Sequence, residues 1–524
     1  MQDESIEQEH SASLRRGAPT VLLVSIFIIA TCGLVYELLA GTLSTYLLGN
    51  SVTQFSIVIG LFLTAMGIGS FLSRYVNRNL IRVFLVVEIL VGLVGGVLTL
   101  VLFAAFALLQ AYVPLLVSLS MLVGTLVGLE IPLIVRIVRT QTTLRAALGN
   151  VLSLDYLGAL AASLLFPLLL VPHLGLVRTG FLFGLFNVVV AFVGLYVFRD
   201  QIKRGVLALG VGASLVALVL LVGLLTASKT TSFLEDLLYQ DEIIYAKRTP
   251  YQRIVLTKWR DDLRLFIDGN IQFSSVDEFR YHESLVHPAM GMSPTPQNIL
   301  ILGGGDGLAA REVFKYSKVK RVDLVDLDPD ITELFSRHEM LVKLNQGSLK
   351  NAHLKIFNED AQKFLERREG LYDVIIIDLP DPNNESLGKL YTKSFYRLVT
   401  RHLAPTGLMV TQATSPFYST AAYWCIVNTI RNTAPFADGP TLSVLPYHAN
   451  VPSFGIWGFV LASRQPLSLE RVELKIETKY LTPELLVGMG VFPKDIGPRD
   501  TPVNRLDNQI LVQLYEKGYQ RYQK

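Results

Sequence analysis

The sequence holds only two cysteines and almost no net charge. Cys32 and Cys425 lie far apart in the 524-residue chain, so neither a disulfide framework nor a cysteine-based metal site is expected. Lys and Arg outnumber Asp and Glu by only 47 to 44, and no basic patch stands out. A protein that binds nucleic acid through its phosphates needs such a patch. The sequence therefore predicts no nucleic-acid partner.

Charged residues are scarce over one long part of the chain. From about Thr20 to Ala227 the sequence consists mainly of Leu, Val, Gly, Ala and Phe, whereas a soluble composition begins near Thr230. A helix needs about 20 apolar residues to cross a bilayer. Because further runs follow the first, a cleaved signal peptide alone does not explain the apolar part of the chain. The sequence predicts a tail over 1–19 and an all-α polytopic membrane domain over 20–227, with about seven spans at 20–47, 55–73, 82–108, 111–135, 150–171, 177–198 and 205–227.

Basic residues between the predicted spans gather on alternate connections. They fall at 74–82, 136–145 and 199–204, after the second, fourth and sixth spans. The positive-inside rule places these connections and the N-terminus in the cytoplasm. Seven crossings would then put the C-terminal part outside the cell.

Four carboxylates interrupt or border the predicted spans, namely Glu37, Glu88, Glu130 and Asp155. An ionised carboxylate at the centre of a bilayer is unfavourable by roughly 2.5–3.5 kcal/mol. Glu37 and Glu130 are candidates for a cation site or a polyamine path, and equally for protonated groups that fix helix packing. For Glu88 and Asp155, near span ends, the packing interpretation is favoured.

The part after residue 228 alternates between strand-like and helix-like segments. An amphipathic connector and a small β-rich subdomain are predicted over 228–290, with hairpins between Tyr251 and Phe273. Repeated βα units predict a mostly parallel, Rossmann-like α/β core over 291–465. The extension over 466–524 carries no chemical signal. The predicted core strands are 299–302, 322–325, 354–357, 373–377, 407–412 and 459–462.

The first of these strands ends in an acidic glycine loop, Gly303-Gly304-Gly305-Asp306-Gly307. The glycines allow a sharp turn and a close approach of backbone to ligand. A phosphate-binding loop avoids a carboxylate, because the two charges repel each other. The loop therefore favours a ligand that is nucleoside-like and cationic.

Further carboxylates follow the later strands, where ligands bind in such sheets. Asp326 lies about twenty residues after the glycine loop, the position of an acid that binds ribose hydroxyls. Asp360 suits an adenine amino group. Each of the two could instead cap the next helix. Asp378 and Asp381 lie in a proline-stiffened turn that can hold one carboxylate against an attacking amine and one against a remote ammonium.

The set of motifs resembles the spermidine synthase (polyamine aminopropyltransferase) family. The N-terminal part is similar to that of its bacterial membrane-bound subgroup, in which several spans precede the synthase domain. The matching residues span roughly 245–465 in the expected order. They are Tyr251-Gln252, Leu265 to Gly269, Gln272, Asp277-Glu278, Tyr281-His282-Glu283, His287-Pro288, Gly303 to Gly307, Arg311-Glu312, Asp326-Leu327-Asp328, Asp360, Asp378 to Pro382, Gln412 and Gly455 to Phe459.

This resemblance implies a methyltransferase-like fold and a metal-free reaction. An aminopropyl group moves from decarboxylated S-adenosylmethionine to putrescine or a related amine, giving spermidine and 5′-methylthioadenosine. It also implies a homodimer or homotetramer in a lipid bilayer, here the bacterial cell (inner) membrane. The cytoplasm is favoured for the catalytic domain, because the donor is made there.

The resemblance also implies roles for individual residues. Asp378 is the general base, which Tyr251 supports, and Asp306 holds the aminopropyl ammonium. The donor site comprises Gly303, Gly304, Gly305, Asp306, Asp326, Asp360, Gln252 and His282, and the acceptor site comprises Asp381, Tyr251, Gln252 and Asp306. The chain departs from the family at Leu308, Ala361, Leu379-Pro380 and Phe454, the last of which puts the acceptor's identity in question.

Two other functions compete with this interpretation. A methyltransferase that uses intact S-adenosylmethionine would bring the carboxylate of its cofactor against Asp306. A polyamine transporter or sensor would need only binding in the soluble part. The complete pair Asp378 and Asp381 argues against an inactive domain, but it leaves transport by the spans open.

Overall fold

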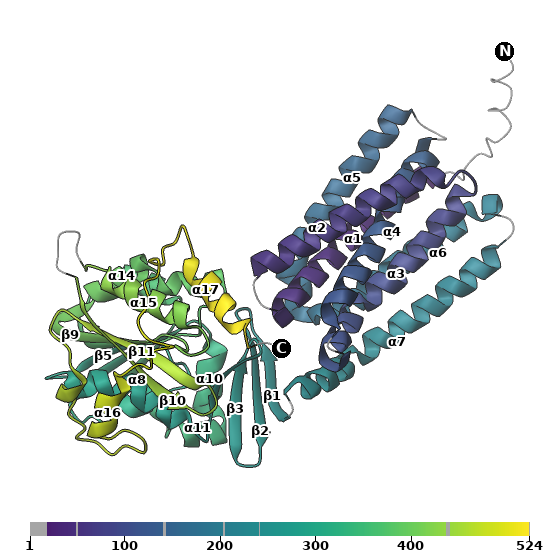
Figure 1. Cartoon of the computed structure of the whole chain (residues 1–524). Helices are drawn as coiled ribbons and strands as arrows, with labels where there is room; N and C mark the ends of the chain where they lie inside the picture. Colours follow the sequence, from purple (N-terminus) through teal and green to yellow (C-terminus); the bar gives the residue numbers. More distant parts are fainter. Residues whose placement is uncertain are drawn as a thin grey trace. The chain divides into compact units, whose positions relative to one another are not determined.

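The computed structural model describes residues 18–48, 51–109, 111–139, 143–202, 205–239, 241–435 and 441–522. The chain divides into two compact units, Met1–Asp241 and Glu242–Lys524. The first is helical and the second combines helices with two sheets (Figure 1).

Among the residues that the structure describes, the helical unit contains six helices that are long and apolar enough to cross a membrane. The sequence predicted seven spans. The difference arises because the fifth and sixth predicted spans lie in one helical stretch, Leu144–Ile202, which is broken only at a kink. The elements of this unit are α1 (Ala18–Leu48), α2 (Ser51–Leu72), α3 (Leu80–Ala104), α4 (Tyr112–Arg139), α5 (Leu144–Leu165), the π-helical turn Phe166–Leu170, α6 (Val171–Ile202) and α7 (Val206–Tyr239).

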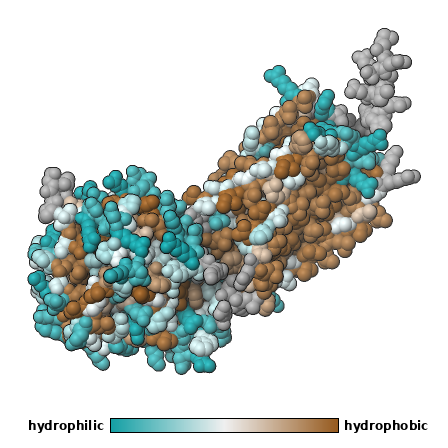
Figure 2. Space-filling model, in the orientation of Figure 1, coloured by the Kyte–Doolittle hydropathy of each residue, from teal (hydrophilic) through white to brown (hydrophobic). Residues whose placement is uncertain are grey.

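Gly175 interrupts the long stretch, since its φ of 75° and ψ of 175° are not helical. Both α5 and α6 contact α1, and Figure 1 shows them as separate rods. The outer surface of the unit is largely apolar, as Figure 2 shows on its visible face. Leucines 63, 168, 207 and 225 are all more than 60% exposed. A continuous apolar surface of this kind is unfavourable in water.

Glycines bring the helices of this unit close together. A Cβ added at Gly92 of α3 would lie 2.8 Å from the carbonyl oxygen of Gly184 in α6. Small residues at such crossings are typical of helices that pack within lipid. Helix α7 continues to Tyr239. It therefore includes the first part of the segment that was predicted to be an amphipathic connector.

The second unit begins with a four-stranded antiparallel sheet in the order β1-β2-β3-β4. Its strands are β1 (Glu242–Arg248), β2 (Arg253–Trp259), β3 (Asp262–Ile267) and β4 (Asn270–Ser274). Asp268 and Gly269 join β3 to β4 with φ values of 48° and 81°. Two successive positive φ values characterise the tight turn that suits a hairpin. The predicted hairpins are therefore present, and β1 is an additional strand.

The main sheet has seven strands in the order β10-β11-β9-β8-β5-β6-β7. Strands β9, β8, β5, β6 and β7 are parallel, and β11 runs antiparallel to both of its neighbours, β9 and β10. The Rossmann-like core predicted from the sequence is thus observed. The strands are β5 (Asn298–Gly303), β6 (Arg321–Asp326), β7 (Leu354–Asn358), β8 (Tyr372–Asp378), β9 (Leu403–Gln412), β10 (Ser443–Val451) and β11 (Gly455–Ser463).

Helices bury both faces of this sheet. Ile299 and Ile301 of β5 belong to one hydrophobic core and Leu300 and Leu302 to the other, because successive side chains point to opposite faces. The first core includes α8 (Glu278–Met292), α9 (Leu308–Val313), α10 (Pro329–Arg337), α11 (Glu339–Leu344) and α16 (Pro483–Met489). The second includes α12 (Ala361–Arg367), α14 (Lys393–Arg401), α15 (Thr420–Arg431) and α17 (Ile510–Tyr519).

The strand order reverses direction between β5 and β8, and this point positions the site. In an open α/β sheet, ligands bind in the crevice beyond the strand ends at such a switch point. Gly303 at the end of β5 pairs in register with Asp378 at the end of β8. The glycine loop and the acidic turn are therefore neighbours.

Candidate functional site

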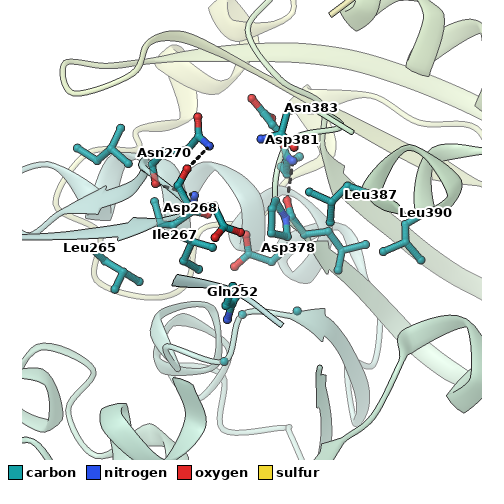
Figure 3. Close-up of a pocket in the computed structure, with 18 of the residues that line it drawn as sticks. Gln252, Leu265, Ile267, Asp268, Asn270, Asp378, Asp381, Asn383, Leu387 and Leu390 are labelled. Atoms are coloured by element: carbon teal, nitrogen blue, oxygen red, sulfur yellow. Dashed lines mark hydrogen bonds between the residues drawn. The ribbon is translucent and has the colours of Figure 1, made fainter. Parts of the chain in front are cut away.

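A cavity of about 660 Å³ lies at this edge of the sheet. Its volume falls within the usual range for small-molecule sites, roughly 300–1,000 Å³. Figure 3 shows Asp378 and Asp381 on one side of it and Ile267 and Asp268 on the other. Every site residue predicted from the sequence lines this cavity: Tyr251, Gln252, His282, Gly303, Gly304, Gly305, Asp306, Asp326, Asp360, Asp378 and Asp381.

The glycine loop folds tightly against the end of β8. Gly303 and Gly304 have φ values of 85° and 65°, and a Cβ at Gly303 would collide with the carbonyl oxygen of Asp378. The N–H of Gly304 donates to that oxygen over 3.2 Å. Glycine is therefore required at Gly303 for both conformation and space.

Asp378 lies at the end of β8, lines the cavity and is hydrogen-bonded to a tyrosine. The hydroxyl of Tyr281, on α8, donates to its Oδ1 over 2.7 Å. Burial raises the pKa of Asp378, while the charge of His282 and the hydrogen bond from Tyr281 oppose that rise. The residue next to the carboxylate is thus Tyr281, whereas Tyr251, which the sequence suggested as its support, is 53% exposed.

A buried ion pair fixes the ring of His282. Its Nδ1 lies 2.7 Å from Oε2 of Glu278, and Arg311 holds both oxygens of the same carboxylate at 2.7 and 2.9 Å. Burial alone would lower the pKa of His282. The hydrogen bond and charge of Glu278, with the charges of Asp306 and Asp378, raise it to about 9. A positive charge therefore offsets part of the negative charge of the cavity at neutral pH.

Asp306 and Asp326 each use backbone N–H groups to fix their carboxyl groups. Oδ1 of Asp306 accepts from Leu308 over 2.9 Å. The two oxygens of Asp326 accept from Asp328 and Gly305, each over 3.0 Å. Burial raises the pKa of both carboxyl groups to about 6. Both side chains are held at the cavity wall with lone pairs left for a ligand.

Asp360 and Gln252 have structural partners as well as a place at the cavity. Asp360 caps α12 by accepting from the N–H groups of Gln362 and Lys363, and Lys389 lies 2.9 Å from its second oxygen. The helix-cap alternative considered for Asp360 is thus present. The side-chain amide of Gln252 donates to Asp328 over 2.9 Å.

Asp381 has partners that the sequence did not reveal. Its Oδ2 accepts from Tyr515 over 3.0 Å and lies 3.2 Å from the hydroxyl of Thr414. Burial raises the pKa of Asp381 to about 6. Tyr515 and Tyr519 belong to α17, in the extension for which no chemical role was predicted, and both line the cavity. The sequence feature that could have indicated this contribution is a pair of aromatic residues four positions apart, which share one face of a helix.

One buried cluster outside the cavity has the residue types of a metal site. Ligand atoms of Glu283, His287 and Glu312 lie within 4.8 Å of one another. However, Glu283 already accepts three backbone N–H groups, from residues 479–481. Glu312 is paired with Arg311 and Lys315. Cationic side chains at this distance oppose a metal ion, so these residues fit an ion-pair network better.

Comparisons with known proteins indicate a single family. The family model described as the spermine/spermidine synthase domain matches residues 278–471. A polyamine aminopropyltransferase of Leptospira interrogans is 46% identical over 502 residues, covering 96% of this chain and 99% of the relative. Polyamine aminopropyltransferase 2 of Ralstonia nicotianae is 46% identical over 513 residues, covering 95% and 98%. A solved spermidine synthase in complex with the transition state analogue AdoDATO is 26% identical, with a TM-score of 0.45 over 49% of this chain and 87% of that chain.

Proposed function

The chain belongs to the polyamine aminopropyltransferase family and is a transferase, and we propose that it moves the aminopropyl group of decarboxylated S-adenosylmethionine to putrescine or a related amine. The products would be spermidine and 5′-methylthioadenosine. The observation that carries the proposal is Asp378, a carboxylate of raised pKa that Tyr281 holds beside an acidic glycine loop.

The donor fits the glycine-loop side of the cavity. Asp326, held by Gly305 and Asp328, is placed to accept hydrogen bonds from ribose hydroxyls. Asp306 is placed to bind the ammonium of the aminopropyl chain. The intact cofactor carries a carboxylate near that ammonium, which Asp306 would repel. The acidic loop therefore supports the decarboxylated form as donor.

The reaction needs one proton acceptor and no redox chemistry. The attacking amine is an ammonium near neutral pH and becomes a nucleophile only when it loses a proton. Asp378 takes that proton. The amine nitrogen then forms a bond to the carbon next to the sulfonium, and the carbon–sulfur bond breaks with its electron pair going to sulfur. The leaving group is a neutral thioether. The cavity contributes by aligning the amine, carbon and sulfur.

The acceptor fits between Asp378 and Asp381. Both residues lie on the same side of the cavity (Figure 3), with Gln252 and Tyr251 also on its lining. A diamine carries two positive charges, so one end can face the base while Asp381 holds the other. Clustered carboxylates also favour a dication over a neutral amine.

The six long apolar helices support insertion of this enzyme into a membrane. Their exposed leucines require lipid or another apolar environment. We place the protein in the bacterial cell membrane, with the second unit, which carries the cavity, in the cytoplasm. An association of two or four copies is part of the same proposal.

The test is turnover by the full-length protein purified in detergent. Decarboxylated S-adenosylmethionine is supplied with a panel of diamines, and mass spectrometry follows methylthioadenosine and a product heavier by C3H7N. We expect equal amounts of the two, and a loss of about 10²–10⁴-fold in kcat for Asp378→Asn. Asp261→Asn, in an exposed turn, is the matched control. Methyl transfer from intact S-adenosylmethionine, or no turnover with any amine, would contradict the proposal.

A further inference from the structure

Helix α17 belongs to the fixed framework of the second unit. The N–H of Leu511 in α17 donates to Oδ1 of Asn504 over 3.4 Å. Asn504 is fully buried and itself donates to the carbonyl oxygens of Gly388 and Tyr391 over 3.2 and 3.1 Å. Leu511 lies in the hydrophobic core, and Ser419 donates to the carbonyl of Leu514 over 3.1 Å. The face that α17 presents to the cavity is therefore held in place.

That face presents stacked aromatic rings. The ring of Tyr519 lies 4.5 Å from that of Tyr515 and stacks on Tyr418 at 5.7 Å and 27°. All three residues line the cavity. The negative faces of such rings attract an alkylammonium, and sets of them recognise methylated amines in other proteins. An aromatic wall beside a carboxylate is thus suited to one charged end of an aliphatic amine.

Asp381, next to this wall, has an unused oxygen. Tyr515 and Thr414 occupy Oδ2, whereas Oδ1 is buried and receives no hydrogen bond within the described residues. The amide of Gln412 lies beside the carboxyl, but its nitrogen donates to the Leu379 carbonyl and the Tyr391 hydroxyl, over 2.6 and 2.5 Å. A buried carboxylate oxygen without a donor is unfavourable. An ammonium would supply both the hydrogen bond and the charge.

We propose that α17 forms the acceptor's distal-ammonium subsite, with Tyr515 and Tyr519 as its wall and Asp381 as its counter-ion. The inference rests on the proposed function and assigns substrate selection to the extension over 466–524. One amine must reach Asp378 while the other lies against Asp381. The fixed wall therefore limits the length of diamine that reacts.

The test compares single variants of the full-length enzyme in steady-state kinetics with a series of diamines of increasing length. We expect Tyr519→Leu to raise the acceptor KM by about tenfold or more, with the donor KM unchanged. Tyr519→Phe keeps the ring and should restore the acceptor KM to within about threefold. Tyr522→Leu is the matched control, because Tyr522 contacts Tyr418 but is 51% exposed and does not line the cavity.

Two outcomes would overturn the subsite. One is an unchanged acceptor KM and length preference in Tyr519→Leu. The other is an equal rise in donor and acceptor KM with a lowered melting temperature, which would indicate a purely structural helix. If the wild type turns over no amine, the proposed function fails instead. The subsite is then tested by calorimetry with putrescine, whose binding Tyr519→Leu must weaken and Tyr519→Phe must retain.

Discussion

Single residues of the cavity predict the pH dependence of the reaction. Burial raises the pKa of Asp306, Asp326 and Asp381 to about 6. In the proposed reaction each must be ionised to hold its part of a cationic substrate, and the charged form is present above the pKa. We expect kcat/KM for the donor, which reports Asp306 and Asp326, and kcat/KM for the diamine, which reports Asp381, each to fall as pH drops through about 6. His282, whose pKa is about 9, stays charged over this range. A profile that is flat down to pH 5 would contradict the assignment.

Tyr281 predicts the pH dependence of kcat, because it contacts Asp378, the proposed proton acceptor. Its hydrogen bond to Asp378 favours the ionised carboxylate and so opposes the rise in pKa that burial causes. In Tyr281→Phe the pKa of Asp378 rises further. We expect the acid limb to move to higher pH and kcat at neutral pH to fall about tenfold, the loss of one hydrogen bond to a charged group. Tyr245→Phe, outside the cavity, is the control. An unmoved acid limb would show that Asp378 does not titrate in the reaction.

At the scale of elements, the ion pair between α8 and α9 predicts a change in stability. Glu278 is 2% exposed and is held by Arg311 and His282. Glu278→Gln leaves a buried guanidinium partly unpaired, which we expect to lower the free energy of unfolding by about 3 kcal/mol. Thermal unfolding of the purified protein measures it. Glu333→Gln breaks the exposed pair with Arg337 and should have little effect. Equal effects of the two variants would contradict this account.

The helical unit holds its own buried pair, Glu88 of α3 and Glu130 of α4. They are 0% and 1% exposed, and their carboxyl groups interact with each other. They accept no hydrogen bond from other side chains or backbone within the described residues. Two ionised carboxylates in one buried site would repel each other, so at least one of the two carries a proton in the absence of a cation. We expect Glu88→Gln to change the free energy of unfolding in detergent by less than about 1 kcal/mol, and Glu88→Lys by about 3 kcal/mol or more. Equal losses in both would indicate an ionised pair around a cation.

Some helices and strands could be predicted from the sequence and others could not. Strands β5, β6 and β8 are short apolar runs that end in Gly or Asp, so both the strands and the edge where their side chains meet were predictable. Strand β10 was missed because Pro446, His448 and Asn450 break the apolar alternation. A strand at the edge of a sheet tolerates such residues, since only one side is paired. The position of Asp360 after a strand indicated either a helix cap or a ligand contact, and of the two the structure shows the cap. The role of α17 was hidden, because two tyrosines on a helix do not reveal the carboxylate they meet across the fold.

For the whole molecule, the number of crossings depends on the stretch Leu144–Ile202. Its 59 residues would extend about 88 Å as a straight helix, nearly three times the roughly 30 Å core of a bilayer. The break at Gly175 is therefore needed if the stretch is to stay within the thickness of the bilayer. Counting this stretch as one crossing or as two changes the side on which the second unit lies relative to the connection at 73–79.

Side-specific labelling tests where the second unit lies. Both natural cysteines are buried, so cysteines introduced at exposed Lys494 and Asn77 report on the second unit and on the α2–α3 connection. Because the donor is made in the cytoplasm, we expect Lys494→Cys to resist an impermeant maleimide in intact cells and to react after permeabilisation. The labelling of Asn77→Cys in the same cells then shows whether the number of crossings between the two positions is even or odd. Protection of both positions requires an even number. Labelling of Lys494→Cys in intact cells would place the active site outside, where it would depend on exported donor and amine.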